Sequence, residues 1–487
     1  MLNNLTKKIN LRLIDIVGNE NFVGDPEVLQ SYSENPYLPL MAKKRKPDLI
    51  VFPSEVEEIV QIMKIANKFE VPVVPRSSGL DPYGDAIPIF GGIMIDLTKM
   101  NKIVDICPTA LDGTFTRVEP GVTFNQLQKE LKSVNMRVLL PARLTAETTP
   151  ASTYFNRNIL FSSAKHNYTV DWSILSYEMV LPTGEILRTG NLTLPESGGT
   201  MPHCHGSDIG RISMGSLGTT GILTKVTTKL KAEPEEKRIY FINSESLLEI
   251  IKSINSILRF SPIEIGEEHI CLNNYCLASL ISVDIKQFEN NVEILPNWTH
   301  IISLTGTSGW VECQDNDLND AIRDLSTKRK SELDGVSKIS EEFDNEFSNP
   351  TRIDRAFNYL PFNRIEFYAS SSQIPLFDKE VRILAEKMGY KRGLGTCLIP
   401  IEQGRSYYVE YDLYFDQSNL KEQKTVRKLY KDLYKYLITN GAFINTPHNF
   451  YVAELLYSKM VTYYENMNKV KKLLDPKGIM HPGKLFL

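Results

Sequence analysis

The sequence predicts an α+β fold of two domains. Short strands alternate with helices from residue 47 to about residue 230, which indicates a mixed domain. A charged turn that contains a proline follows at residues 233–237, and such turns are typical of domain boundaries. A second series of helices and strands begins after this turn. With 487 residues, the chain is long enough for two or three packed domains.

The first strand and helix follow Pro47. Residues 47–53 are a short β-rich run that ends at Pro53, and Ser54 to Glu57 then form a Ser-x-x-Glu capping box. Apolar residues recur at spacings of three and four up to about Glu70. We therefore expect a helix with one buried face, followed by a strand at residues 71–74.

A loop rich in small residues comes directly after that strand. Residues 75–85 carry two glycines and two prolines, which exclude a regular element there. Strands are predicted at residues 93–97 and 115–121, and a helix at residues 122–131.

The second half of the chain has its own set of predicted elements. We expect helices at residues 245–258 and 376–388, and strands at residues 301–304, 364–369 and 407–415.

Charge and hydropathy exclude several classes of protein. The net charge is -4 and the 55 Lys and Arg residues are scattered, so neither a nucleic-acid-binding stripe nor a polybasic membrane anchor is indicated. The N-terminus has no apolar core of a signal peptide, and no stretch approaches the roughly 18 apolar residues of a spanning helix. We expect a soluble, cytoplasmic protein that does not bind a membrane.

The cysteines do not form a metal or disulfide pattern. The six residues are dispersed and contain no CxxC pair: Cys107, Cys204, Cys271, Cys276, Cys313 and Cys397. Buried, reduced thiols are the expectation. The His203-Cys204-His205 run resembles a metal pair but has no second cluster of ligands, so we read it as a polar loop and expect no metal site.

The small residues at 76–79 fit a site for a pyrophosphate. Glycine and small hydroxyl residues allow backbone N–H groups to turn toward an anion. The same composition also fits an ordinary surface turn. The neighbouring motifs distinguish the two interpretations.

Seven motifs in this order and spacing resemble the vanillyl-alcohol oxidase and p-cresol methylhydroxylase superfamily. They lie at residues 73–79 (Val-Val-Pro-Arg-Ser-Ser-Gly), 83–88, 91–97, 100–103, 119–122, 181–190 and 218–225. The C-terminal segment 474–484, which ends in His-Pro-Gly-Lys, continues the resemblance. It implies an FAD-binding PCMH-type domain at residues 1–232, completed by 455–487, and a substrate-binding cap domain with an antiparallel sheet at 233–454.

The resemblance also implies which residues bind FAD. The loop residues would wrap the pyrophosphate and ribityl chain: Pro75, Arg76, Ser77, Ser78, Gly79, Leu80, Tyr83 and Gly84. Hydroxyl residues would line the opposite side: Thr148, Thr149, Ser152 and Thr153. Main-chain groups around Gly221 and Ile222 would meet the adenine or flavin end, and Lys484 is a candidate for the pyrimidine edge, where a cation stabilises reduced flavin.

The sequence departs from the family at the sites of covalent FAD attachment. Many members carry a histidine where this chain has Leu80, so no histidyl link is expected from the loop. Other members attach FAD from the cap domain, and Tyr408 or Val409 takes that place here. A tyrosyl link at Tyr408 and an aromatic residue on a half-buried strand are both open.

The substrate-binding motifs of two branches are also changed. The Tyr-Arg pair that binds phenols in relatives is absent from residues 443–448, and the metal-binding histidines of the D-lactate and glycolate dehydrogenases have no counterpart. Three residues remain as candidates for the catalytic base: Asp171, His166 and His448.

We therefore expect an FAD-dependent oxidoreductase. A small hydroxyl-bearing or benzylic organic substrate would give hydride to flavin N5, and oxygen or a protein carrier (a cytochrome, an Fe–S protein or an electron-transfer flavoprotein) would reoxidise the flavin. The alternatives are a flavoprotein subunit of a larger electron-transfer complex, a 2-hydroxy acid dehydrogenase, and a flavin-fold protein without catalysis. A homo-oligomer is also possible.

Overall fold

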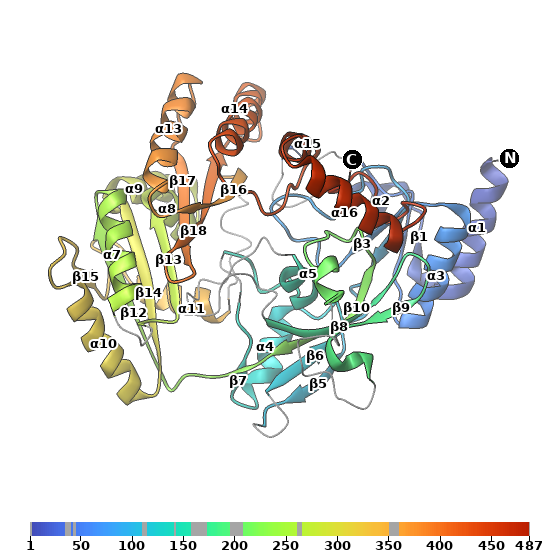
Figure 1. Cartoon of the computed structure of the whole chain (residues 1–487), viewed down its shortest axis with the longest axis horizontal. Helices are drawn as coiled ribbons and strands as arrows, with labels where there is room; N and C mark the ends of the chain where they lie inside the picture. The colour runs from blue at the N-terminus through green and yellow to red at the C-terminus, as the bar shows by residue number, and fades with distance from the viewer. Residues whose placement is uncertain are drawn as a thin grey trace.

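The computed structural model describes residues 2–34, 40–41, 45–109, 114–140, 143–156, 173–194, 208–260, 265–349 and 360–486. Figure 1 shows the N-terminal half, in blue to green, beside a large sheet in yellow to orange. The red helices α15 (Phe450–Tyr457) and α16 (Val461–Leu474) return over the N-terminal half. The predicted two-domain α+β fold is confirmed.

The first sheet, close to the N-terminus, is mostly parallel. Its order is β1-β2-β4-β3, with strands Phe22–Val23, Leu49–Val51, Ile93–Asp96 and Val73–Arg76. Helices α1 (Leu2–Val17) and α3 (Val56–Phe69) share its core, while α2 (Pro26–Ser31) is a short connection.

The start of α3 differs by one residue from the prediction. Glu58, rather than Glu57, closes the capping box with Glu55, and its carboxylate also accepts the backbone N–H of Ser54 at 2.6 Å. The predicted buried face is present, with Ile59, Met63 and Ala66 inside.

A second, antiparallel sheet of the N-terminal half carries the wall of the site described below. Its order is β5-β6-β10-β8-β9, with strands Ile103–Cys107, Phe115–Val118, Ile222–Lys229, Ile174–Val180 and Ile186–Arg188. Helices α4 (Phe124–Lys132) and α5 (Pro150–Phe155) pack on it with a shared apolar core. A small pair, β7 (Met136–Arg137) and β11 (Lys231–Ala232), and the short helix α6 (Gly210–Ser213) complete this half.

The C-terminal segment returns to the edge of the first sheet. The backbone N–H of Val73 donates to Ile479 at 2.8 Å, and that of His481 donates to Val73 at 2.8 Å. The last residues of the chain therefore lie beside the loop that follows β3.

The second half is built on an antiparallel sheet of seven strands. Its order is β15-β12-β14-β13-β17-β18-β16, with strands Arg329–Lys330, Glu236–Ser244, Trp298–Gly306, Glu268–Asn273, Leu394–Ile401, Ser406–Tyr414 and Phe362–Ser370. The helices are α7 (Leu247–Phe260), α8 (Asn274–Ile281), α9 (Ile285–Ile294), α10 (Ser308–Ile322), α11 (Ile339–Ser348), α13 (Ile374–Lys387) and α14 (Leu420–Thr439).

The two faces of this sheet differ in chemistry. Ile365 and Phe367 of β16 lie in the core formed with the apolar faces of α7, α10, α13 and α14. Because side chains alternate along a strand, Arg364 and Glu366 lie on the other face, together with Tyr408 of β18. Charged groups of the sheet are therefore directed toward the N-terminal half.

The cysteine prediction is right only in part. Cys271, Cys276 and Cys397 are buried and free, but Cys313 is exposed because it lies on the solvent side of α10, and Cys107 is half-buried. Cys204 lies outside the described residues, as do its two neighbouring histidines. In the described ranges, none of the helices combines the length and the apolar character needed to cross a bilayer.

Candidate functional site

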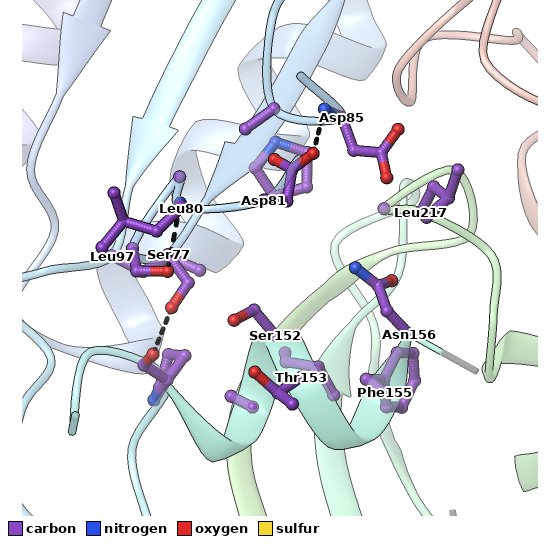
Figure 2. Close-up of a pocket in the computed structure, with 18 of the residues that line it drawn as sticks. Ser77, Leu80, Asp81, Asp85, Leu97, Ser152, Thr153, Phe155, Asn156 and Leu217 are labelled. Atoms are coloured by element: carbon purple, nitrogen blue, oxygen red, sulfur yellow. Dashed lines mark hydrogen bonds between the residues drawn. The ribbon is translucent and has the colours of Figure 1, made fainter. Parts of the chain in front are cut away.

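A cavity lies between the loop that follows β3 and the first turn of α5. Figure 2 shows Ser77, Leu80 and Leu97 at one end of it, Asp85 and Leu217 at the other, and α5 beneath. The loop before β10 closes the third side.

Hydrogen bonds hold the loop against α5. The Ser77 hydroxyl contacts the carbonyl of Pro120 at 2.6 Å and the Thr149 hydroxyl at 2.7 Å. Thr149 in turn caps α5 by accepting the backbone N–H of Ser152 at 3.1 Å. Two backbone turns with small side chains are thereby fixed face to face, an arrangement that suits an anion such as a pyrophosphate.

Three glycines make room in the walls of the cavity. A Cβ on Gly79, where φ is +67°, would lie 2.4 Å from the guanidinium carbon of Arg76. A Cβ on Gly218, where φ is +72°, would lie 2.6 Å from a ring carbon of Pro75, and one on Gly221 would meet a backbone oxygen at 2.7 Å. At Gly218 and Gly221 the added Cβ would meet ring or backbone atoms that cannot easily move aside, whereas at Gly79 it is the positive φ that favours glycine.

The cavity collects eight of the predicted cofactor residues: Pro75, Ser77, Ser78, Gly79, Leu80, Ser152, Thr153 and Gly221. It also collects residues that the sequence did not indicate, among them Asp81, Asp85, Leu217 and His481. Seven predicted residues of the described part of the chain do not line it: Arg76, Tyr83, Gly84, Thr148, Thr149, Ile222 and Lys484.

Local contacts explain why these residues do not line the cavity. The Arg76 guanidinium lies over the Tyr32 ring, 4.6 Å from its centroid, and the Thr148 hydroxyl donates to the carbonyl of Thr145. Ile222 is in the core of the first sheet, and Gly84 is in a turn at φ +71°. Tyr83 and Lys484 belong to a neighbouring cluster of charges.

That cluster begins at Asp85, at one end of the cavity. Its carboxylate accepts the Nδ1 proton of His448 at 2.7 Å and a proton of the Lys484 ammonium at 2.8 Å. Lys484 also donates to the carbonyl of His448 at 2.9 Å. Three residues from distant parts of the chain therefore meet in one buried site.

Glu366 lies on the other side of His448. It accepts from Nε2 of His448 at 3.2 Å, from the Tyr408 hydroxyl at 2.7 Å and from the Tyr83 hydroxyl. The Tyr83 ring stacks on the His448 imidazole with 3.6 Å between ring centroids. Only 3% of Glu366 is exposed, so this carboxylate is surrounded by donors and shielded from water.

The protonation states follow from these contacts. Burial alone would lower the pKa of His448, but the carboxylates of Asp85 and Glu366 raise it to about 9, so the ring is an imidazolium at neutral pH. Burial would raise the pKa of Asp85, but His448 and Lys484 hold it well below its usual range. Burial and then the negative charge of Glu366 raise the pKa of the Tyr83 and Tyr408 hydroxyls, which therefore keep their protons.

Asp81 has a different environment. Burial and the nearby charge of Asp85 raise its pKa to about 6. Its Oδ1 accepts the backbone N–H groups of Tyr83 and Asp85, at 2.8 Å and 3.0 Å, and so shapes the turn that places Asp85.

A second group of buried charges joins the two halves of the molecule. Arg143, at φ +60° in the loop before α5, pairs with Glu410 at 2.6 Å and with Asp412 at 2.5 Å. Arg364 pairs with the same two carboxylates at 3.3 Å and 3.0 Å. The loop that leads to the cavity is thereby anchored on the large sheet.

Two predicted catalytic residues lie outside the described residues, Asp171 and His166. The third candidate base, His448, and Tyr408, the candidate for the tyrosyl link, contact the same carboxylate of Glu366. A sequence signal for Glu366 exists in the strict alternation of charged and apolar residues at 364–367 and 409–412.

Replacement of Gly79 by valine is expected to abolish cofactor retention. The new side chain would displace the Arg76 guanidinium, strain a positive φ and add bulk where Gly79 lines the cavity. Purified Gly79→Val should contain almost no FAD after acid release and chromatography. Gly389→Val is the matched control, because Gly389 has φ +70° and no atoms within 4 Å of its Cβ. Full FAD content in Gly79→Val would show that this loop does not hold the cofactor.

The raised pKa of His448 predicts a pH-dependent stability. A group whose folded pKa is about 9 and whose ordinary value is 6.5 contributes its full stabilisation below pH 6.5 and loses it as the pH rises through 9. The contribution is about 3 kcal/mol at 1.36 kcal/mol per pKa unit. The difference in melting temperature between wild type and His448→Gln should therefore shrink from pH 6.5 to pH 9.

His481→Gln is the control for this pH series. Burial and the charge of Lys484 lower the pKa of His481 to about 4, so its contribution should stay constant in the same window. A constant difference for His448→Gln would mean that its imidazole is neutral in the folded protein.

Comparison with known proteins identifies a family over part of the chain. Residues 47–190 match the family described as FAD binding domain. Glycolate oxidase subunit GlcD of Bacillus subtilis (strain 168) is 24% identical over 99% of this chain and 97% of its own length.

Two solved structures share the whole fold. They are 4-ethylphenol oxidase from Gulosibacter chungangensis in an isoeugenol complex and p-cresol methylhydroxylase with substrate bound. Each has a TM-score of 0.83 and 17% sequence identity, and the alignment covers 99% of this chain and 97% of the other.

Proposed function

We propose that this chain, which belongs to the FAD-linked oxidoreductases of the vanillyl-alcohol oxidase and p-cresol methylhydroxylase superfamily, dehydrogenates a small hydroxyl-bearing or benzylic organic substrate. The observation that supports this reaction is the buried Glu366, which meets His448 and Tyr408 beside the cavity. FAD bound in the cavity supplies the hydride acceptor, N5 of its ring.

The cavity residues would hold FAD in one direction. Ser77, Ser78 and Gly79 would hold the pyrophosphate, and Leu97, at the same end of the cavity as Ser77, would lie beside the adenosine. The residues at the end marked by Asp85 and Leu217, next to the charged cluster, would then hold the flavin ring. Lys484 reaches this end through Asp85, and its positive charge would favour the anion formed on reduction.

Glu366 is the proton acceptor in this proposal. His448 is already protonated, and the two tyrosines keep their protons, so none of the three accepts another. Asp85 is a weak base because His448 and Lys484 stabilise its charge. Glu366 is the carboxylate of the cluster that comes from the cap sheet, so we assign it the hydroxyl proton of the substrate as hydride leaves carbon. In this proposal Asp81 shapes the turn that places Asp85, and His448 holds the Glu366 carboxylate in place.

The domain boundaries fit the same proposal. We place the FAD-binding domain at residues 1–232, completed by 455–487, and the cap domain at 233–454. The pairing of Val73 with the C-terminal segment and the start of β12 at Glu236 support this division. The substrate would then bind where the charged face of the cap sheet meets the cavity.

A 2-hydroxy acid is the second candidate substrate. The full-length similarity to a glycolate oxidase subunit favours it, and the same comparison favours an arrangement in which this chain is one subunit of a larger complex.

Anaerobic reduction of the bound flavin tests the proposal. FAD-loaded protein is mixed with benzyl alcohol, p-cresol, 4-ethylphenol, glycolate and D-lactate, and the flavin absorbance is followed. Bleaching by an alcohol or a phenol supports the leading candidate, and bleaching by glycolate or D-lactate alone supports the second. If FAD is bound but no donor of a wider panel bleaches it, both candidate substrate classes are contradicted.

A further inference from the structure

A second cavity lies on the other side of the segment that closes the cofactor cavity. Its volume is about 590 Å³, within the usual range for ligand sites. Its walls come from α15, α16, residues 443–447, residues 211–220 and the C-terminal residues 485–486, all in the described part of the chain.

One stretch of chain separates the two cavities. Leu217, Gly218 and Gly221 line the cofactor cavity, whereas Ser216 and Thr220 of the same stretch line the second one. Pro447 of the second cavity also immediately precedes His448 of the charged cluster. A ligand in the second cavity would therefore be separated from the cofactor by this single stretch of chain.

The lining suits a flat, apolar molecule. Three methionines face the cavity, Met214, Met460 and Met467, together with the rings of Phe443 and Tyr457. Thioether side chains adapt to the shape of a ligand, and aromatic rings stack on planar groups.

Hydroxyl donors at the wall suit a ligand with carbonyl oxygens. Thr446 is 4% exposed, and no described residue hydrogen-bonds to its hydroxyl. Ser216 and Thr220 share one hydrogen bond of 3.0 Å, which leaves one of their two hydroxyl protons for a ligand. Lys471 and Arg211 also line the cavity, but the Lys471 ammonium donates to Asp475 and to the carbonyl of Met480, and Arg211 pairs with Asp208 at 3.3 Å. Because both cations already have partners, the site favours a neutral ligand.

We infer that the second cavity binds a quinone that reoxidises the reduced cofactor. This inference rests on the proposed function in one respect: the chain must bind FAD. Reduced FAD would give two electrons through the wall and release two protons to solvent. The quinone would take up the two electrons and, at its two carbonyl oxygens, two protons from solvent, so that it leaves as the hydroquinone and FAD returns to its oxidised state. The thin wall at 216–221 permits this transfer without contact between donor and quinone.

Binding of menadione to the oxidised, FAD-loaded protein tests the site independently of activity. Calorimetry should show binding to wild type, and Met467→Trp should weaken it by on the order of tenfold or more by filling the cavity. Thr446→Val should weaken it by a few fold, since a single hydrogen bond is lost. Leu473→Trp is the control, because Leu473 is on α16 but 80% exposed.

The second readout is reoxidation after photochemical reduction, which needs no donor. Menadione should reoxidise Met467→Trp far more slowly than wild type, while oxygen should reoxidise both at the same rate. Absence of menadione binding, or equal reoxidation of Met467→Trp and Leu473→Trp by menadione, would overturn the inference. Met467→Trp could also bind menadione normally while its flavin is no longer reduced by the donor. That result would assign the cavity to the donor and would also overturn the inference. A failure of every donor to bleach the flavin would contradict the proposed function alone.

Discussion

Glu366→Gln should slow reduction of the flavin by its donor on the order of 100-fold or more, the usual contribution of a general base. Glutamine keeps the shape of the side chain and can still meet Tyr408 and His448, but it cannot take the proton of the substrate hydroxyl. FAD should remain bound, because Glu366 does not line the cofactor cavity. Anaerobic stopped-flow measurement of flavin bleaching gives the rate.

Glu268→Gln is the matched control for this variant. Glu268 is a carboxylate on β13 of the same sheet and is only 5% exposed, but it has no contact with the charged cluster in the described residues. Its reduction rate should equal that of wild type. A wild-type rate in Glu366→Gln together with a loss in Asp171→Asn would move the proton acceptor to Asp171.

Arg143→Met should destabilise the protein by about 3–5 kcal/mol, the range expected when one partner of a buried ion pair is removed. Arg143 neutralises Glu410 and Asp412, and without it these two carboxylates face Arg364 alone. The loop before α5 would also lose its anchor on the large sheet. Thermal and urea unfolding, each followed by far-UV circular dichroism, measure the loss.

A double variant separates charge from shape at this position. Glu410→Gln added to Arg143→Met should recover part of the stability, because it removes one of the unpaired charges. Lys252→Met is the control for the loss of an exposed pair, since Lys252 is 57% exposed beside Glu249 and such pairs contribute little. If Arg143→Met unfolds like Lys252→Met, the buried charges do not hold the two halves together.

Local chemistry made much of the cofactor cavity predictable from the sequence. The small residues at 76–80 and the motif at 218–225 identify the two loops that form its walls, because tight turns and close backbone approach require such residues at fixed spacing. The direction of individual side chains was not predictable. Arg76 turns back over Tyr32, and Thr148 bonds within its own turn, because partners outside the motif compete for them.

The charged cluster depends on contacts that no local pattern encodes. Asp85 is 363 residues from His448 and 399 from Lys484, and Glu366 comes from a strand of the other half. The sequence indicated His448, Tyr408 and Lys484 separately through the resemblance, but the carboxylates that join them required the packing of the two halves. The regular alternation of charged and apolar residues along β16 and β18 was the one sequence signal for these carboxylates. Buried charges need partners, so Arg364 and Glu366 on one face of a buried strand indicate that charged or polar groups pack against that face.

The most direct measurement is flavin reduction by a donor that carries deuterium at the carbon to be oxidised. FAD-loaded wild type and Glu366→Gln are mixed anaerobically with the protiated and the deuterated donor, and bleaching is followed. Hydride transfer beside Glu366 predicts slower bleaching with deuterium in wild type and a much lower rate in Glu366→Gln with either donor. Bleaching at one rate for both donors, with Glu366→Gln equal to wild type, would contradict the assigned chemistry and its site.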